Sequence, residues 1–296
     1  MSDARELKPT DGDSHFDRRR FLGVLPVAAV ALANLRAADV STQPTPSQGP
    51  LDAIGVQLYT VREAMARDVE GTLAAIAEIG YREVELWRLH GLAASEMGAL
   101  LDRLGLEAVS SHDSIEVIRG EWPRRLDEAA QLGQSYLVCP SIPRVERTLE
   151  GYRRITDDFN EAGEAAGAMG MRLGYHNHDH EFRTIDGVVP YDLLLERCDP
   201  QFVDMQADLF WMVHAGVDPL DYFATHPGRF SSVHVKDRTV DGDMVDLGEG
   251  VIDFAAIFAR SEQAGIRHVF VEHDRPNDPM ESVRIGFDYL ERLDES

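Results

Sequence analysis

The sequence is short of positive charge and of long apolar runs. Its 296 residues include 29 Lys and Arg against 52 Asp and Glu, a formal net charge of −23. A chain this acidic lacks the basic surface that nucleic acids and anionic membranes attract, so neither is an expected partner. Its N-terminal apolar run, Leu22 to Leu35, falls short of the roughly 20 residues that a membrane-spanning helix needs.

Cysteine is also scarce. The two cysteines, Cys139 and Cys198, are too few for a disulfide framework, although an oxidising compartment would permit one bridge. Cys139 lies in the apolar run SYLVCP, where we expect a buried thiol. Disulfides are therefore not the expected source of stability, and 44% hydrophobic residues are enough for a sizeable core.

Residues 14–38 have the composition of a targeting segment. Three arginines, Arg18 to Arg20, precede Phe21 and the apolar run, and small residues follow at which a peptidase could cleave. This order resembles a twin-arginine-type export signal, which carries folded and often cofactor-loaded proteins across a bacterial inner membrane. We expect the signal segment, residues 1–38, to be cleaved after Ala33 or after Ala38, and residues 39–50 to be a flexible linker. The mature protein would then be periplasmic, without stable membrane insertion; an uncleaved anchor is the alternative.

From residue 51 the chain alternates short apolar runs with helical patterns, several of which end in glycine, as a left-handed C-cap requires. Eight strands alternating with eight helices over residues 51–296 predict a single (β/α)₈ TIM barrel. A doubly wound sheet competes, but no G-x-G-x-x-G follows the first strand. The predicted strands are Ala53–Tyr59, Glu83–Trp87, Ala108–His112, Ser135–Pro140, Arg172–Asn177, Phe202–Asp208, Ser231–Lys236 and His268–Glu272. The predicted helices are Val69–Ile79, Leu92–Leu104, Arg124–Leu132, Leu149–Met169, Tyr191–Arg197, Pro219–Thr225, Phe254–Ala264 and Met280–Leu293.

The carboxyl ends of these strands carry most of the chemistry. Active sites of such barrels lie at that end, so the residues there are the candidate site. Because a strand alternates faces with period two, His176 and His178 in MRLGYHNHDHEF point the same way and Asn177 points the other. The strand ends are Gln57 and Tyr59, Glu85 and Trp87, Ser110 and His112, Cys139, His176 and His178, Asp208, His234 and Lys236, and Glu272.

Three of these ends form a plausible metal set. Asp208, His234 and Glu272 end successive strands, and His176 is a fourth candidate ligand. Mixed oxygen and imidazole donors suit Mn²⁺, Co²⁺, Zn²⁺ or Fe²⁺ better than Ca²⁺. Such a metal would stabilise the enediolate that forms when a proton leaves the carbon next to a sugar carbonyl. Two alternatives stay open: Asp208 as a helix N-cap, and Lys236 as half of a surface ion pair with Asp237.

Other strand ends supply candidate catalytic and substrate-binding groups. Glu272, Lys236 and His178 are candidates for the acid and base by position. Aromatic rings stack on the apolar faces of sugars, although aromatic residues are also common in cores. The candidate substrate-binding residues are Gln57, Tyr59, Glu85, Trp87, His112 and Trp211.

Seven segments together resemble the sugar phosphate isomerase/epimerase family, part of the xylose isomerase-like TIM barrel superfamily. That family commonly binds a metal through Glu, Asp, His and Glu on strands five to eight, which by motif implies His176, Asp208, His234 and Glu272 as ligands. The first position departs from the pattern, because ketose epimerases use a glutamate there. The family's D-T-x-H also reads D-L-F-W from Asp208. The segments are GVQLYTVR (55–62), GYREVELW (80–87), GYHNHDHEF (174–182), DLFWMVHAGVDP (208–219), SVHVKD (232–237), DLGEGVIDF (246–254) and FVEHD (270–274).

The resemblance and the export signal together rank the functions. We expect a metal-dependent isomerase or epimerase that acts on a free sugar or glycoside, because phosphorylated sugars are mainly cytoplasmic and no phosphate-binding glycine loop or arginine cluster is evident. Elimination from a 3-keto-glycoside by a lyase or dehydratase is the second interpretation, and a non-catalytic sugar-binding barrel the third. DNA repair of the endonuclease IV kind is disfavoured by the acidity. A homo-oligomer is left open.

Overall fold

A computed structural model describes residue 49 and residues 51–294. The predicted signal segment, residues 1–38, and the predicted linker, apart from Gly49, lie outside the described residues. No helix in the described part of the chain is long and apolar enough to cross a membrane.

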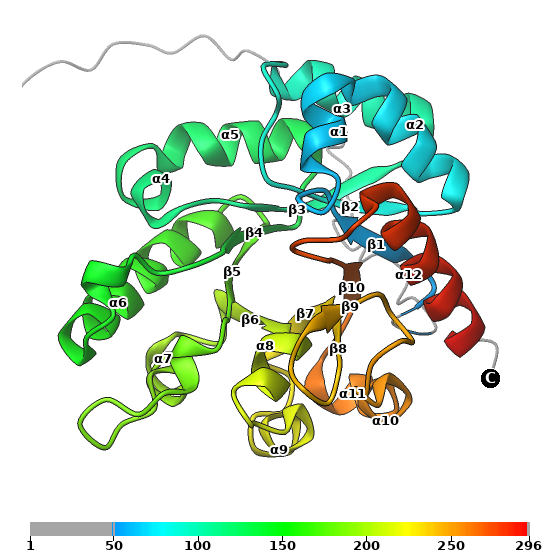
Figure 1. Cartoon of the computed structure of the whole chain (residues 1–296). Coiled ribbons are helices and arrows are strands. Elements are labelled where there is room, and N and C mark those ends of the chain that lie inside the picture. The colour runs from blue at the N-terminus through cyan, green and yellow to red at the C-terminus, as the bar shows by residue number, and fades with distance from the viewer. Residues whose placement is uncertain (1–48, 50, 295–296) are drawn as a thin grey trace, which may run out of the picture. The chain divides into compact units, whose positions relative to one another are not determined.

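Eight parallel strands close into a barrel in the order β1-β10-β7-β6-β5-β4-β3-β2 (Figure 1). This confirms the predicted (β/α)₈ fold and each of the eight predicted strands to within two residues at either end. The strands are β1 (Ile54–Gln57), β2 (Glu83–Leu86), β3 (Glu107–His112), β4 (Tyr136–Cys139), β5 (Arg172–His176), β6 (Val203–Asp208), β7 (Phe230–Val235) and β10 (His268–Val271). A separate two-stranded sheet pairs β8 (Asp237–Arg238) with β9 (Met244–Val245).

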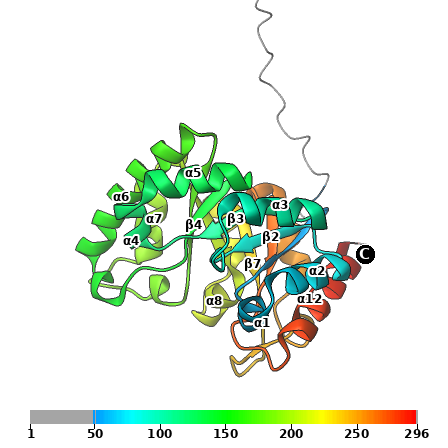
Figure 2. The same cartoon turned by 90° about the horizontal axis from the view of Figure 1, so that it is seen from above.

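Helices surround the barrel and connect its strands. The predicted helix over 254–264 is two short helices, and the single-turn helices that directly follow strands were not predicted. In Figure 2 the short α1 and α8 lie at the same end of the barrel as the loop after β10. The helices are α1 (Arg62–Arg67), α2 (Val69–Ile79), α3 (Ala94–Leu104), α4 (Ile115–Gly120), α5 (Trp122–Leu132), α6 (Leu149–Gly167), α7 (Pro190–Arg197), α8 (Leu209–His214), α9 (Pro219–Thr225), α10 (Phe254–Phe258), α11 (Ser261–Ala264) and α12 (Pro279–Asp294), with 3₁₀ turns η1 (Arg144–Glu146) and η2 (His180–Phe182).

Local signals in the sequence set several helix ends. The Asp68 carboxylate accepts the Gly71 N–H at the start of α2, as an N-cap does. Gly105 and Gly133 end α3 and α5 at φ of 68° and 70°, which favour glycine. Gly170, at φ 79°, closes the turn after α6 in the same way: its N–H donates to the Gly167 carbonyl, and the Met171 N–H donates to the Ala166 carbonyl.

The barrel interior is layered along its axis. His268 and Phe270 of β10 and Glu272, which follows β10 directly, share the inner face, so a polar layer, an apolar layer and a second polar layer follow one another toward the carboxyl ends of the strands. Phe270 fills the middle with Val109 and Val138. A Cβ on Gly55 would lie 2.6 Å from the Phe270 ring, so the neighbouring strand needs glycine there. The apolar layer thus separates the two polar ends of the barrel.

Both cysteines are buried and free. Burial raises the pKa of the Cys139 thiol and of the Cys198 thiol to about 12, so neither is a thiolate at neutral pH. The prediction of a buried thiol at Cys139 is confirmed.

Candidate active site

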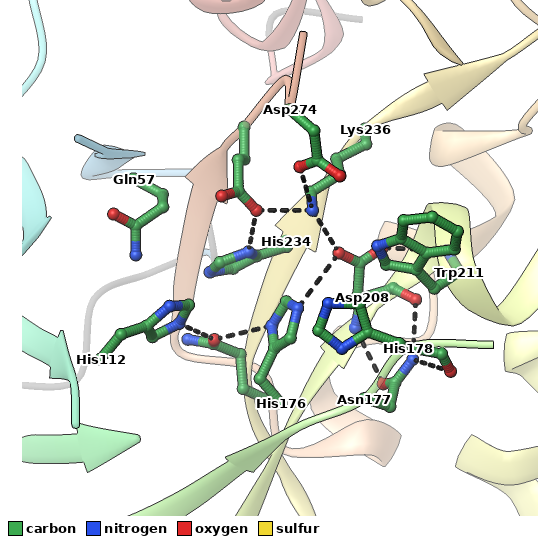
Figure 3. Close-up of polar contacts among 12 residues, drawn as sticks. Gln57, His112, His176, Asn177, His178, Asp208, Trp211, His234, Lys236 and Asp274 are labelled. Atoms are coloured by element: carbon green, nitrogen blue, oxygen red, sulfur yellow. Dashed lines mark hydrogen bonds and ion pairs between the residues drawn. The ribbon is translucent and has the colours of Figure 1, made fainter. Parts of the chain in front are cut away.

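The carboxyl end of β5 contributes two imidazoles to one face of the strand. The rings of His176 and His178 lie 5.1 Å apart, and both side chains line the same cavity (Figure 3). Asn177 points away and joins β5 to β6, because its Oδ1 accepts the Asp208 N–H at 3.0 Å and its Nδ2 donates to the Asp208 carbonyl. The predicted alternation along this strand is confirmed.

Asp208 uses its two carboxylate oxygens differently. Oδ1 accepts the Trp211 N–H at 2.9 Å and caps α8, as the alternative interpretation proposed. Oδ2 lies 2.8 Å from the Lys236 ammonium and 3.5 Å from His176 Nε2. Burial raises the pKa of Asp208 to about 6, although Lys236 and His234 act to lower it. One side chain therefore holds a helix and also faces the site.

His234 lies between two buried carboxylates. Its Nδ1 is 2.7 Å from Glu272 Oε2 and its Nε2 is 2.6 Å from Glu85 Oε1. Burial alone would lower its pKa, but Glu272 and Glu85 outweigh burial and raise the pKa of His234 to about 10. The same pair of contacts fixes the orientation of the ring.

Lys236 is a buried ammonium shared by three carboxylates. Its Nζ lies 2.8 Å from Asp208, 2.6 Å from Glu272 and 2.9 Å from Asp274. Burial opposes the charge, but these carboxylates hold the pKa of Lys236 well above its ordinary value. Lys8 is the only other lysine of the chain, and all other members of the Lys and Arg set are arginines.

The alternative of a surface ion pair between Lys236 and Asp237 is wrong. Both side chains are buried, and Asp237 makes no ion pair among residues 51–294. Its carboxylate instead accepts the backbone N–H groups of Gly248, Gly250 and Ile252 at 3.0–3.2 Å. Asp237 therefore fixes the loop after β9, while Lys236 turns into the barrel.

Glu85 organises the layer beneath the site. Its carboxylate accepts hydrogen bonds from Gln57 Nε2 and Gln206 Nε2, both at 2.7 Å, and contacts His112 and His234. Burial would raise its pKa, but the two imidazoles hold the pKa of Glu85 well below its ordinary value. Glu85 is thus a buried anion that orients His234 from below.

A cavity of about 670 Å³ opens above this layer. Of the predicted site residues, Gln57, Glu85, Asp208, Trp211 and His234 are not among its lining side chains. Contact of Gln57, Glu85 and Trp211 with a substrate stays a prediction. The lining residues are Tyr59, Arg62, Trp87, His112, Asp113, Ser114, Val117, Pro140, Ser141, His176, His178, Lys236, Glu272, Asp274 and Arg275.

His178 lines the cavity with an imidazole nitrogen to spare. Its Nδ1 is buried and has no hydrogen-bond partner in the described part of the chain. Burial lowers the pKa of His178 to about 4, so the ring is neutral at physiological pH. The Trp211 ring holds it at 5.5 Å between centroids. A neutral imidazole on the wall of the cavity is equipped to take a proton from a bound ligand.

The four predicted metal ligands come together. One donor atom from each of His176, Asp208, His234 and Glu272 lies within 4.8 Å of the other three. Two imidazoles and two carboxylates suit a divalent transition metal or zinc. The Lys236 ammonium, 2.6–2.8 Å from two of the carboxylates, shows that these oxygens are arranged around a positive charge. The residues present therefore fit a divalent cation.

Three contributors were missed from the sequence. Asp274 follows β10 by three residues and binds Lys236, and it was already within the quoted segment FVEHD. Gln206 shares the inner face of β6 with Asp208 and contacts His176 Nδ1 at 3.1 Å. Glu181 is buried beneath His178 and accepts that residue's N–H at 2.9 Å. Strand alternation places Gln206 on the same face as Asp208, although it was not among the predicted site residues; the contacts of the other two depend on loop conformation.

Comparison with known proteins places this geometry in a family. The model of the xylose isomerase-like TIM barrel family matches residues 73–293. A solved structure named sugar phosphate isomerase/epimerase, from Parabacteroides distasonis, superposes with a TM-score of 0.71 at 28% identity. That similarity covers 80% of this chain and 96% of the other.

Curated relatives give a second name. An inosose dehydratase of Geobacillus kaustophilus is 24% identical over 64% of this chain and 74% of its own length. An inosose dehydratase of Geobacillus thermodenitrificans is 29% identical, but the match covers 42% of this chain and 47% of the relative. These matches are similarities of part of the chain, and they leave its own reaction to be inferred from the site.

Proposed function

This chain belongs to the xylose isomerase-like TIM barrel family, and we propose that it is a metal-dependent lyase acting on a keto-sugar or a cyclic keto-polyol. In the proposed reaction a base removes the proton from the carbon next to the carbonyl. The bond from the adjacent carbon to its oxygen substituent then breaks, and the departing oxygen takes up a proton. The products are an unsaturated ketone and water or an alcohol. The dehydratase names of the curated relatives support elimination.

One observation carries this proposal: a single glutamate, Glu272, lies among the four clustered donors, and an imidazole, His176, takes the β5 position. An epimerase that reprotonates the opposite face needs a matched group on each side of the carbon. An elimination needs one base and one acid, which can be of different kinds. The unequal set of side chains fits elimination better.

His176, Asp208, His234 and Glu272 would hold the metal. When bound, the metal supplies positive charge that stabilises the enolate oxygen. Glu85 contacts Nε2 of His234, and this contact leaves Nδ1 to face the donor cluster, as carboxylates behind metal-binding imidazoles do.

Two side chains on the cavity wall would act on the substrate, His178 by moving the proton and Lys236 by its charge. His178, neutral and on the cavity wall, is the base that takes the proton from carbon, and its imidazolium then returns that proton to the departing oxygen. Lys236 keeps its charge and donates a hydrogen bond to a substrate oxygen, so that negative charge developing there is offset. The Asp274 carboxylate, 2.9 Å away, holds the ammonium at the cavity surface.

Isomerisation or epimerisation is the second candidate. It begins with the same proton, and the name of the Parabacteroides distasonis neighbour favours it. We also propose that the chain is exported through the segment 14–38, which would bring free sugars or glycosides rather than intracellular metabolites to the site.

Proton NMR in D₂O separates these candidates. The zinc-loaded protein would be incubated with ketoses, inososes and 3-keto-glycosides, because zinc is diamagnetic and preserves the spectrum. An unsaturated ketone with water or alcohol released supports the lyase. Deuterium next to the carbonyl with an isomeric sugar would replace it with the second candidate. Binding of these compounds without any exchange of hydrogen would contradict both and leave a sugar-binding barrel.

A further inference from the structure

The charged residues of the cavity wall are not balanced evenly. Asp113 bonds to Arg125 at 2.6 Å, whereas Glu272 and Asp274 share the single ammonium of Lys236 with Asp208. The negative charge that Lys236 leaves unbalanced lies in the inner part of the cavity, among the four clustered donors. The outer part of the cavity differs, because charged residues of the wall there lack partners of opposite charge in the described part of the chain.

Two arginines of the wall have no acidic partner. Neither Arg62 nor Arg275 makes an ion pair among residues 51–294, in a chain with 52 acidic residues. Arg62 lies over the Tyr59 ring at 4.4 Å and donates to the Tyr59 carbonyl at 2.9 Å, so its guanidinium is held in place. Arg275 is exposed, and its side chain makes no hydrogen bond within the described chain.

Barrel closure brings these arginines to one side of the mouth. Arg62 follows β1 and Arg275 follows β10, and these two strands pair directly although they are more than 200 residues apart in the sequence. Trp87 follows β2, the other neighbour of β1, and meets Tyr59 edge to face at 5.4 Å. We call Tyr59, Arg62, Trp87 and Arg275 the outer rim. All four line the cavity.

The outer rim offers donors and almost no acceptors. A guanidinium has five N–H donors and no acceptor, and an indole has one donor only. The Trp87 Nε1–H is buried and has no acceptor among the described residues. The group that matches such a surface accepts hydrogen bonds and carries negative charge, as a carboxylate or a phosphate does.

We propose that the outer rim is an anion subsite that binds a carboxylate or phosphate substituent of the substrate. The reacting carbonyl would lie deeper, near His178 and Lys236, and this placement rests on the proposed function. The cavity of about 670 Å³ is within the range of roughly 300–1,000 Å³ that holds ligands larger than one small ring. The substrate class would therefore be an acidic or phosphorylated sugar.

Calorimetric binding to the zinc-loaded protein tests this subsite with three unreactive probes. Glucuronate and glucose 6-phosphate carry the two anions, and glucose is the neutral reference. We expect at least one anion to bind about tenfold or more tightly than glucose, since hydrogen bonds to charged groups are the stronger ones. That advantage should fall as salt is raised. Equal affinity for all three probes would overturn the subsite.

Variants of the rim give the decisive comparison. Arg62→Gln and Arg275→Gln should each remove most of the anion advantage and leave glucose binding unchanged. Arg67→Gln is the matched control, because Arg67 is exposed at the end of α1, makes no ion pair in the described chain and does not line the cavity. An equal loss in the control would show a general field of the protein and overturn the subsite.

The two proposals can fail separately. Loss of anion binding in Arg62→Gln without any turnover of keto-sugars by the wild type would support the subsite and contradict the lyase. Equal turnover of a neutral keto-sugar by the wild type and by Arg62→Gln, with no anion preference in either, would support the lyase and overturn the subsite.

Discussion

The two ends of the barrel both bury charges, but they balance them in different ways. At the amino ends of the strands, Arg172 binds Asp204 at 2.5 and 2.6 Å and also donates to the carbonyls of Pro200 and Gln201. Across that end, His268 binds Glu83 at 2.9 Å. Each charge there has its own partner, so the group is complete without any ligand.

At the carboxyl ends, charges are shared rather than paired. One ammonium serves three carboxylates, one imidazole lies between two, and a buried imidazole nitrogen has no partner in the described chain. Acceptors therefore outnumber donors, and the surplus fits a cation. The comparison indicates that one end stabilises the fold and the other is arranged for chemistry, as TIM barrels generally are.

The largest expected effect comes from Glu272→Gln. The change removes the carboxylate shared by His234 and Lys236, so metal retention and charge balance are both lost. We expect turnover to fall by about 10³-fold or more while the protein stays folded, since glutamine keeps the shape. Steady-state kinetics with circular dichroism would check this. Full activity in the variant would remove Glu272 from the site.

Lys236→Met should reduce the rate by about 10²-fold or more, because it removes the donor to the substrate oxygen. It should also lower stability, since Asp208, Glu272 and Asp274 lose their common cation. Lys236→Arg keeps the charge but changes its shape, and we expect it not to restore the rate. Reduced stability at unchanged kcat would assign Lys236 to structure alone.

Arg172→Met, at the amino ends of the strands, should lower the stability of the protein and leave its rate unchanged. Leaving Asp204 buried without its partner costs about 3 kcal/mol of unfolding free energy. For a domain of this size that corresponds to a Tm lower by roughly 6–12 °C. The folded fraction should keep its kcat. Arg154→Met is the control, because its pair with Glu150 is exposed and should be worth less than about 1 kcal/mol. A large loss of kcat in Arg172→Met would break the contrast between the two ends.

Glu181→Gln refines the comparison between the two ends of the barrel. Glu181 lies at the carboxyl ends of the strands, yet His180 and Tyr175 give it partners of its own. Burial raises its pKa, but hydrogen bonds from His180 and Tyr175 outweigh burial and keep the pKa of Glu181 below its ordinary value. A folded pKa below the unfolded one contributes stability at neutral pH that is lost as pH falls through the folded value. We expect the variant to be about 1–2 kcal/mol less stable at pH 7.

The same variant should lose less stability than the wild type on acidification. Urea unfolding at pH 7 and at pH 4 would measure both differences. A variant that matched the wild type at both values would show that Glu181 is not ionised in the folded protein.

Much of the fold followed from the sequence because the strand signals are local. Apolar runs bounded by glycine and polar turns located all eight strands, and strand alternation placed His176 and His178 on one face. The short helices α1, α4 and α8 were missed, since a single turn after a strand has too few residues for a periodic pattern.

The candidate site was predicted at its strand ends and missed in its loops. Asp208, His234 and Glu272 lie at or beside strand ends, so the fold brings them together. Asp274 reaches Lys236 only through the conformation of the loop after β10. Arg62 and Arg275 become neighbours on the cavity wall only because β1 closes onto β10. Contacts that depend on loops and on ring closure leave no pattern in the sequence.

Metal content tests the central contrast most directly. The wild type, Asp208→Asn and Arg172→Met would each be dialysed with zinc or manganese and analysed by mass spectrometry. Asparagine at 208 can still cap α8, so this variant removes the charge and leaves the helix start intact. We predict one bound ion per chain in the wild type and in Arg172→Met, and none in Asp208→Asn. Metal retained by Asp208→Asn, or absent from the wild type, would contradict the account.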